Sequence, residues 1–469
     1  MSLRTGPWLP STPRRRVSSG FTVGDMSDQF FTTVDGPIPY LGPDVPEPLA
    51  FKWYDAERVV GDRTMAEHLR MAVCYWHSFN WDGSDVFGSG TFARPWLDPA
   101  LDPMEAARAK MDVAFEFMEK LGAPFWCFHD RDIAPEATTF VESCARLEEM
   151  AERAEAHMSR TGIRLLWGTA NLFSHPRYMA GAATNPDPEV FAHAAAQVAR
   201  CMEVTRDLGG ANYVLWGGRE GYDTLLNTDL AREADQMGRF LNMVVEHKHD
   251  IGFEGQILLE PKPQEPTKHQ YDHDVATVHA FLQRYGLEGE IKVNIEVNHA
   301  TLAGHDFAHE IATAAAVGLL GSVDANRGDD RLGWDTDQFP NSVESMSLAV
   351  HEILAAGGLG SGGFNFDTKL RRQSIDPEDL FHAHIGGMDT LARSLLVAHA
   401  MYTDGALTEV VARRYSGWEG ELGRSIMTGD RTLAGLGELV ANGRIDPTPV
   451  SGRQEALENI VNHYVQTVR

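Results

Sequence analysis

Cysteine, long apolar runs and basic charge are all scarce in this chain of 469 residues. The four cysteines, at positions 74, 127, 144 and 201, show no CxxC spacing, so we expect reduced thiols rather than a disulfide framework. No segment approaches the roughly 20 apolar residues of a membrane helix, and the first 25 residues lack the apolar stretch of a secretory signal. We therefore expect a cytoplasmic protein without a membrane partner.

The shortage of basic charge also restricts the partners that the chain can bind. Lys and Arg total 41 against 67 Asp and Glu, which gives a formal net charge of −26. Nucleic-acid binding depends on Lys and Arg that neutralise phosphates, so this balance argues against nucleic acid and suits cations better. Hydrophobic residues make up 43% of the chain and charged residues 23%, as in an ordinary folded globular protein.

The N-terminal segment differs from the rest in composition. Residues 1–20 are rich in Pro, Ser and Arg, with three consecutive arginines at positions 14–16, and they offer little apolar surface to bury. We expect residues 1–47 to form an N-terminal extension that is partly disordered, with Met26 as a candidate start. Deletion of residues 1–25 is then expected to leave the activity intact.

From residue 71 onward, short apolar runs alternate with helical patterns, which is typical of parallel β/α units. Eight apolar runs are the number that closes a (β/α)8 barrel, the TIM barrel, which we place within residues 48–370. The remaining residues, 371–469, show helical patterns without strand signals, and we expect a C-terminal helical arm for subunit contacts. The eight runs are 71–76, 125–129, 163–169, 213–216, 256–260, 291–296, 321–324 and 363–367.

Acidic side chains close several of these runs. The active site of a TIM barrel lies where its strands end, so polar residues at these positions are the ones that could meet. The loop after the seventh run adds two more carboxylates, in the sequence Gly-Trp-Asp-Thr-Asp. The candidate metal ligands are Glu260, Glu296, His299, Asp324, Asp335, Asp337 and Asp367.

Six carboxylates on one rim predict a cation site. Like charges held within a few ångströms cost several kcal/mol unless protons or cations neutralise them. A set of six oxygen donors and one nitrogen suits octahedral ions such as Mg²⁺, Mn²⁺ or Co²⁺ better than zinc. Seven ligands exceed the needs of one small ion, and two divalent ions that share a carboxylate would satisfy the set.

Two further polar groups lie at the same strand ends. Lys262, two residues after Glu260, points the same way in an extended strand. It could place an ammonium beside a developing oxyanion, or simply form an ion pair with the acidic cluster. His129 and Asp132 provide a titratable imidazole with a carboxylate to orient it, although a histidine at a strand end is often structural.

Aromatic residues lie at or just after the first and fourth runs. Trp76, Phe87 and Trp216 could line a sugar pocket and exclude water. The same residues would be unremarkable in a hydrophobic core, so this signal gains weight only beside the acidic cluster.

Several long motifs, in chain order, resemble those of xylose isomerases, in particular the longer class II form. The resemblance runs from about residue 48 to the C-terminus. The motifs include Phe-His-Asp at 128–130, Val-Leu-Trp-Gly-Gly-Arg-Glu-Gly-Tyr at 214–222, Glu-Pro-Lys-Pro-Gln-Glu-Pro at 260–266, Asn-Ile-Glu-Val-Asn-His at 294–299 and Gly-Trp-Asp-Thr-Asp-Gln-Phe-Pro at 333–340.

The resemblance implies isomerisation of D-xylose to D-xylulose, and of D-glucose to D-fructose, by ring opening and a metal-assisted 1,2-hydride shift. It implies two divalent ions per subunit, Mg²⁺ in the first place and Mn²⁺ or Co²⁺ as alternatives. One ion would be held by Glu260, Glu296, Asp324 and Asp367, and the other by Glu296, His299, Asp335 and Asp337.

The resemblance also implies roles for residues outside the ligand set. His129, oriented by Asp132, would assist opening of the sugar ring, and Lys262 would bind the oxygen at C1. A homotetramer is implied, in which the C-terminal arm wraps a neighbouring subunit and Phe87 reaches into an adjacent subunit's pocket.

Other enzymes and binding proteins fit parts of the pattern. Rhamnose isomerase is a related alternative that a substrate panel would separate. A zinc endonuclease of the abasic-site type on the same barrel would need more histidines at strand ends and a basic rim. A structural calcium site would leave Lys262 and the His129–Asp132 pair on the same rim unexplained.

Overall fold

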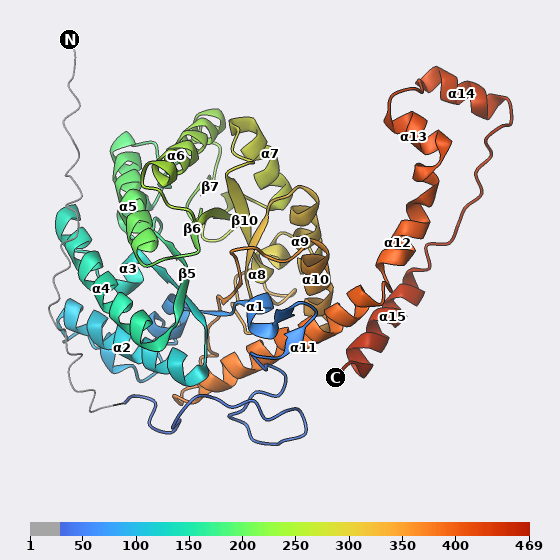
Figure 1. Ribbon diagram of the computed structural model, residues 1–469. Coiled ribbons are helices and arrows are strands. Elements are labelled where there is room, and N and C mark those ends of the chain that lie inside the picture. The colour runs from blue at the N-terminus through green and yellow to red at the C-terminus, as the bar shows by residue number, and fades with distance from the viewer. Residues whose placement is uncertain (1–28) are drawn as a thin grey trace, which may run out of the picture.

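The computed structural model describes residues 29–469 (Figure 1). The predictions made for residues 1–28, including a start at Met26, lie outside the described residues. The first regular elements are β1 (Val59–Val60) and β2 (Arg63–Thr64), an antiparallel pair that leads into the short helix α1 (Met65–Leu69). Thr64 and Glu67 form a capping box at the start of this helix.

Eight parallel strands close into a barrel, which confirms the predicted (β/α)8 fold. The strands follow one another around the barrel in chain order, and the last pairs with the first. Each strand overlaps one of the predicted apolar runs. The strands are β3 (Ala72–Cys74), β4 (Phe125–His129), β5 (Arg164–Thr169), β6 (Asn212–Trp216), β8 (Gln256–Glu260), β10 (Ile291–Glu296), β11 (Leu320–Asp324) and β12 (Phe364–Phe366).

Helices surround the strands on the outside of the barrel (Figure 1). The first of them has a cap at each end: Asp102 accepts hydrogen bonds from the backbone N–H groups of Met104 and Glu105, and Gly122 ends the helix with φ 78°. The outer helices are α2 (Pro103–Leu121), α4 (Phe140–Thr161), α5 (Pro188–Asp207), α6 (Leu230–Asp250), α7 (Val275–Tyr285), α9 (Phe307–Ala316), α10 (Val343–Ala355) and α11 (Asp379–Thr403).

Short elements occupy the loops that follow the strands. A five-residue π-helix (Trp76–Asn80) comes after β3, and α3 (Asp130–Ile133) and α8 (Val297–Leu302) begin directly after β4 and β10. The strands β7 (Gly221–Tyr222) and β9 (His269–Gln270) pair in an antiparallel ribbon. None of these short elements was predicted from the apolar pattern, because each is too short to show a period.

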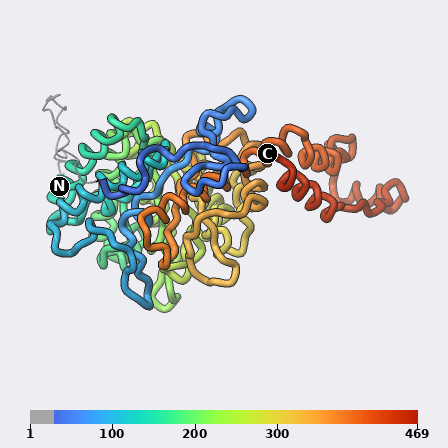
Figure 2. Tube along the Cα trace, turned by 90° about the horizontal axis from the view of Figure 1, so that it is seen from below, coloured from blue at the N-terminus to red at the C-terminus, as the bar shows by residue number. Residues whose placement is uncertain are grey.

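The C-terminal region has two parts with different surroundings. Helix α11 packs along α10, and α15 (Gln454–Thr467) returns to place Val461 against Val397 and Met401 of α11. Between them, residues 408–441, here called the outer segment, project away from the barrel in both views (Figures 1 and 2). The outer segment contains α12 (Thr408–Tyr415), α13 (Glu421–Met427) and α14 (Leu433–Ala441). The boundary placed at residues 370 and 371, and the role in subunit contacts, stay predictions.

Within residues 29–469, no helix combines the length and the apolar character that crossing a membrane requires.

Candidate metal centre

A cavity of about 390 Å³ lies at the carboxyl ends of the barrel strands. Six of the seven candidate ligands line it, and Asp324 is fully buried without reaching the cavity. His129, Asp132, Lys262, Trp76 and Trp216 line the same cavity. The structure therefore brings nearly all the residues singled out in the sequence to one place, while their roles stay predictions.

One group of carboxylates comes from four strand ends. Glu296 and Asp324 are direct neighbours across β10 and β11, and Glu260 and Asp367 close the adjoining strands β8 and β12. One oxygen from each of the four carboxylates lies within 4.8 Å of the others. This spacing allows the four side chains to share a single cation.

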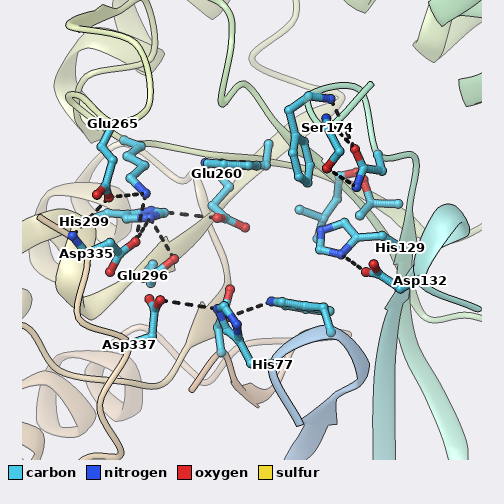
Figure 3. Close-up of a pocket in the computed structure, with 18 of the residues that line it drawn as sticks. His77, His129, Asp132, Ser174, Glu260, Glu265, Glu296, His299, Asp335 and Asp337 are labelled. Atoms are coloured by element: carbon cyan, nitrogen blue, oxygen red, sulfur yellow. Dashed lines mark hydrogen bonds and ion pairs between the residues drawn. The ribbon is translucent and has the colours of Figure 1, made fainter. Parts of the chain in front are cut away.

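A second group shares Glu296 with the first. One oxygen each from Glu296, Asp335 and Asp337 lies within 4.8 Å of the others. Figure 3 shows these three side chains on the same side of the pocket. His299 lies one helical turn after Glu296, and its Nε2 is 2.9 Å from Glu296 Oε2 and 3.1 Å from Asp335 Oδ2. Asp337 has an uncommon positive φ of 43°, and its backbone oxygen accepts a hydrogen bond from the N–H of Lys369 at 2.8 Å.

Three of the buried carboxylates have raised pKa values. Burial and the neighbouring Asp324 raise the pKa of Glu260 well above its usual range, and burial with Asp335 does the same for Glu296. Burial and the charge of Asp367 raise the pKa of Asp324 to about 7. Buried carboxylates in this state are stabilised by cations, and a set of six oxygens and one imidazole nitrogen suits divalent metal ions. The buried groups are therefore consistent with metal sites.

The imidazole of His129 lies on the opposite side of the cavity from Asp335 and Asp337 (Figure 3). Its Nδ1 is 2.6 Å from Asp132 Oδ2. Its ring packs against Trp76, with ring centroids 4.3 Å apart, and against Phe173 at 5.5 Å. The carboxylate and the two aromatic rings hold the imidazole in one orientation beside the cavity.

The ammonium of Lys262 faces the second group of ligands. Its Nζ is 2.8 Å from Asp335 Oδ2 and 3.3 Å from Glu265 Oε2, and 5.2 Å from the centre of the Trp216 ring. Although burial opposes it, Asp335 and Glu296 raise the pKa of Lys262 above its usual range. In the same way Lys262 and His299 outweigh burial and hold the pKa of Asp335 well below its usual range.

Known proteins similar to this chain match it along most of its length. The xylose isomerase of Mannheimia succiniciproducens is 60% identical over 428 residues, which cover 91% of this chain and 97% of that protein. The chain belongs to the xylose isomerase family. The xylose isomerase of Mesorhizobium japonicum is 59% identical over 442 residues, which cover 94% of this chain and all of that protein.

Two family models match parts of the chain. A xylose isomerase-like TIM barrel model matches residues 147–340, and a XylA2 C-terminal domain model matches residues 411–465. Among solved structures, a putative xylose isomerase from Rhodospirillum rubrum covers 69% of this chain and 98% of that chain, with a TM-score of 0.48 and 14% identity. This last likeness is too weak to inform either fold or function.

The three aromatic residues expected at the pocket differ in position. Trp76 and Trp216 line the cavity, and Trp76 Nε1 donates to Asp367 Oδ1 at 2.9 Å. Phe87 is 95% exposed and does not line it. The sequence-based expectation for Phe87 concerned an adjacent subunit, so its contact stays a prediction.

Two basic residues of the cavity were missed in the sequence. His77 Nε2 is 3.1 Å from Asp367 Oδ1 and 3.3 Å from Asp337 Oδ2, and these carboxylates raise the pKa of His77 to about 9 against the effect of burial. Lys369 Nζ is 2.7 Å from Asp337 Oδ2. Lys369 follows Asp367 by two residues, so the spacing rule that singled out Lys262 could have found it. His77 lies on the unpredicted π-helix, but it directly follows the first apolar run, so the strand-end rule could have found it as well.

Proposed function

We propose that this chain is a metal-dependent aldose–ketose isomerase that converts D-xylose to D-xylulose and also D-glucose to D-fructose. The supporting observation is that two groups of side chains that could hold a metal ion meet at one cavity with a histidine–carboxylate pair and a buried lysine. Opening a sugar ring and moving hydrogen between adjacent carbons call for acid–base, electrostatic and Lewis-acid groups of these kinds. Xylose is named as the substrate because the relatives are xylose isomerases.

The proposed cofactors are two divalent ions, Mg²⁺ in the first place and Mn²⁺ or Co²⁺ as alternatives. When bound, they would supply Lewis acidity to the oxygens on C1 and C2 of the open-chain sugar. The shared carboxylate of Glu296 would hold both ions together. The first ion would bind to Glu260, Glu296, Asp324 and Asp367, and the second to Glu296, His299, Asp335 and Asp337.

Ring opening is assigned to His129. In the cyclic sugar, a proton must leave the hydroxyl on C1 while the ring oxygen gains one. The Nδ1 side of the imidazole is held by Asp132 at 2.6 Å, which leaves the other nitrogen to exchange a proton with the sugar. Asp132 is thus a positioning residue for His129.

In the open sugar, the hydrogen on C2 moves as a hydride to C1, and the proton of the C2 hydroxyl moves to the oxygen of C1. The aldehyde becomes a hydroxyl group and C2 becomes a ketone, so atoms and electrons balance. Lys262 is proposed to donate a hydrogen bond to the C1 oxygen while negative charge develops there. Trp76 and Trp216 form an apolar wall that limits access of water to the reacting carbons.

The assembly is also proposed from the family resemblance. Residues 48–370 would form the catalytic barrel, and helices within residues 371–469 would make subunit contacts in a homotetramer. Phe87, which is exposed in the single chain, would reach the cavity of an adjacent subunit. The expected cytoplasmic location stays a prediction.

The activity is tested by following xylulose formation from xylose with protein stripped by EDTA. We expect no turnover without metal and recovery on addition of Mg²⁺, Mn²⁺ or Co²⁺. A stripped protein that is fully active would refute the metal dependence. No activity on xylose with any of the three metals would refute the proposed substrate, and a panel of aldoses that includes rhamnose would then define the correct one.

A further inference from the structure

Two asparagines contact the candidate metal ligands from within the barrel. Asn294 lies on β10 two residues before Glu296, and Asn326 follows β11 two residues after Asp324. Both side chains are fully buried, and neither lines the cavity. They are therefore not placed to touch a sugar, and their amide N–H groups donate to the surrounding protein.

Asn294 bonds to two carboxylates at once. Its Nδ2 donates to Glu260 Oε2 at 3.0 Å and to Asp324 Oδ2 at 2.8 Å. In the proposed assignment these two carboxylates bind the first ion and not the second. A further buried asparagine, Asn365 on β12, donates to the other oxygen of Asp324 at 2.8 Å. Two of the four proposed ligands of the first ion, Glu260 and Asp324, are therefore held by neutral amide donors.

Asn326 bonds to the shared carboxylate and to the helix that carries the histidine ligand. Its Nδ2 donates to Glu296 Oε1 at 2.6 Å and to the backbone oxygen of Asp367 at 3.0 Å. Its Oδ1 accepts from the backbone N–H of Asn298 at 2.9 Å, in the first turn of α8 and one residue before His299. One side chain thus fixes the distance between the bridging carboxylate and the start of α8.

A neutral amide is well suited to this place. An N–H donor orients a carboxylate and favours its ionised form, which is the form that binds metal. Unlike a lysine or arginine, an amide adds no positive charge that would repel the cation at short range in a buried site. Partners of this kind behind the direct ligands strongly influence metal affinity.

We propose that Asn294 and Asn326 are positioning residues for the metal ligands, Asn294 for those of the first ion alone and Asn326 for those of both ions. Loss of Asn294 should weaken binding of the first ion. Loss of Asn326 should weaken both ions, the second more strongly, because Glu296 is shared and His299 depends on α8. The inference rests on the proposed function, since it assumes two ions in this cavity.

The experiment is a calorimetric titration of the full-length, EDTA-stripped protein with Mn²⁺. It compares the wild type with Asn294→Ala and Asn326→Ala, and a His299→Ala reference variant identifies the binding step of the second ion. Asn212→Ala is the matched control. Asn212 is equally buried, on β6, and its Nδ2 donates to the backbone oxygens of Leu166 and Ser361 rather than to a candidate ligand.

We expect Asn294→Ala to weaken the first step roughly 10- to 100-fold and leave the second unchanged. Asn326→Ala should weaken both steps, and Asn212→Ala neither. Affinities like those of the wild type in both test variants would overturn the inference, as would an equal loss in Asn212→Ala, which would indicate general loosening of the barrel. Circular dichroism checks the fold of each variant, and Asn→Leu changes of similar size replace any alanine variant that does not fold.

The titration separates this inference from the proposed activity. A wild type that binds two Mn²⁺ ions and isomerises no aldose would refute the activity, while the variants would still decide the roles of the asparagines. A wild type that isomerises xylose beside Asn variants with unchanged affinities would leave the activity standing and refute the inference. A wild type that binds no Mn²⁺ would overturn the inference together with the metal sites.

Discussion

The barrel and the outer segment differ in how far their apolar residues are buried. Helix α11, on the barrel, buries Phe381, Leu391 and Leu395 completely or almost so, whereas α12 and α14 in the outer segment have no buried residue. In the outer segment, Trp418 is 49% exposed and Leu433 is 91% exposed. Exposed apolar side chains gathered in one segment are typical of a contact surface. The barrel has its own core, and we expect the outer segment to bury its exposed apolar side chains against another molecule.

The two regions also differ in the proposed chemistry, which lies entirely in the barrel. Every candidate metal ligand, together with His129 and Lys262, belongs to the barrel strands or to the loops that follow them. None lies in residues 408–441. A change to a metal ligand should therefore leave assembly unaltered, and a change to the outer segment should leave metal binding unaltered.

The largest effect is expected from Glu296→Gln, which removes one charge from the carboxylate shared by both groups. The amide is a poorer metal ligand, so we expect kcat to fall roughly 1,000-fold or more and metal binding to weaken. Assembly should not change. Glu310→Gln is the matched control, because Glu310 is also buried but accepts from the N–H of Val275 outside the cavity. Xylulose assays and metal titration check both variants, and near-normal turnover of Glu296→Gln would refute the two-metal site.

The expected contact surface of the outer segment is tested by Trp418→Asp combined with Leu433→Asp. Charges on these exposed apolar positions should prevent burial against a partner, so the assembly is expected to dissociate to smaller species. The barrel itself should stay folded. Light scattering after size-exclusion chromatography measures the mass, with Val141→Asp on α4 as the control, since Val141 is 71% exposed on the barrel. An unchanged mass of the double variant would show that the outer segment does not hold the subunits together.

The barrel could be predicted in detail because its signals are local. Each strand is a short run of branched and aromatic residues, and the strands β4, β8 and β10 have the predicted boundaries at both ends. The outer segment gave only a general helical pattern. Its expected role in subunit contacts would depend on surfaces of other molecules, and a single sequence does not encode those surfaces in any period or motif.

The site was predictable in its ligands and less so in what supports them. Acidic residues at strand ends stand out because uncompensated charge in a barrel is costly, and this argument found Glu260, Asp324 and Asp367. Asn294 and Asn326 are neutral, so the charge argument passes over them, even though Asn294 lies within the sixth apolar run and opens one of the resembling motifs. Their importance is visible only from the donor and acceptor atoms that the closed barrel brings together.

A smaller effect on turnover is expected from His129→Gln. The variant should slow turnover of cyclic xylose roughly 100-fold, because ring opening loses its acid–base group. Glyceraldehyde, which is too short to close a stable sugar ring, should be affected much less. The ratio of the two rates is measured for wild type and variant, beside Asp132→Asn as a milder companion. Equal slowing of both substrates would place His129 at another step.

The smallest effect is expected on the free energy of unfolding. It tests whether a buried histidine of the barrel makes stability depend on pH. His384 on α11 is fully buried among Phe117, Phe339 and Phe366, and burial lowers its pKa from 6.5 to about 4. Between these values the unfolded chain binds more protons than the folded chain. Stability should therefore fall as the pH falls from 6.5 towards 4, by about 2 kcal/mol at pH 5.

His384→Phe should remove this acid-sensitive contribution, because Phe does not titrate. His384 Nε2 has no hydrogen-bond partner among the described residues, and Nδ1 donates only to the backbone oxygen of Leu380 in the preceding turn. The apolar ring can therefore replace it at small cost at pH 7. Urea unfolding in EDTA at pH 7 and pH 5 measures the difference between wild type and variant, in which the other titrating groups cancel. An identical loss in both proteins would mean that acid acts elsewhere, for example at the contacts of the outer segment.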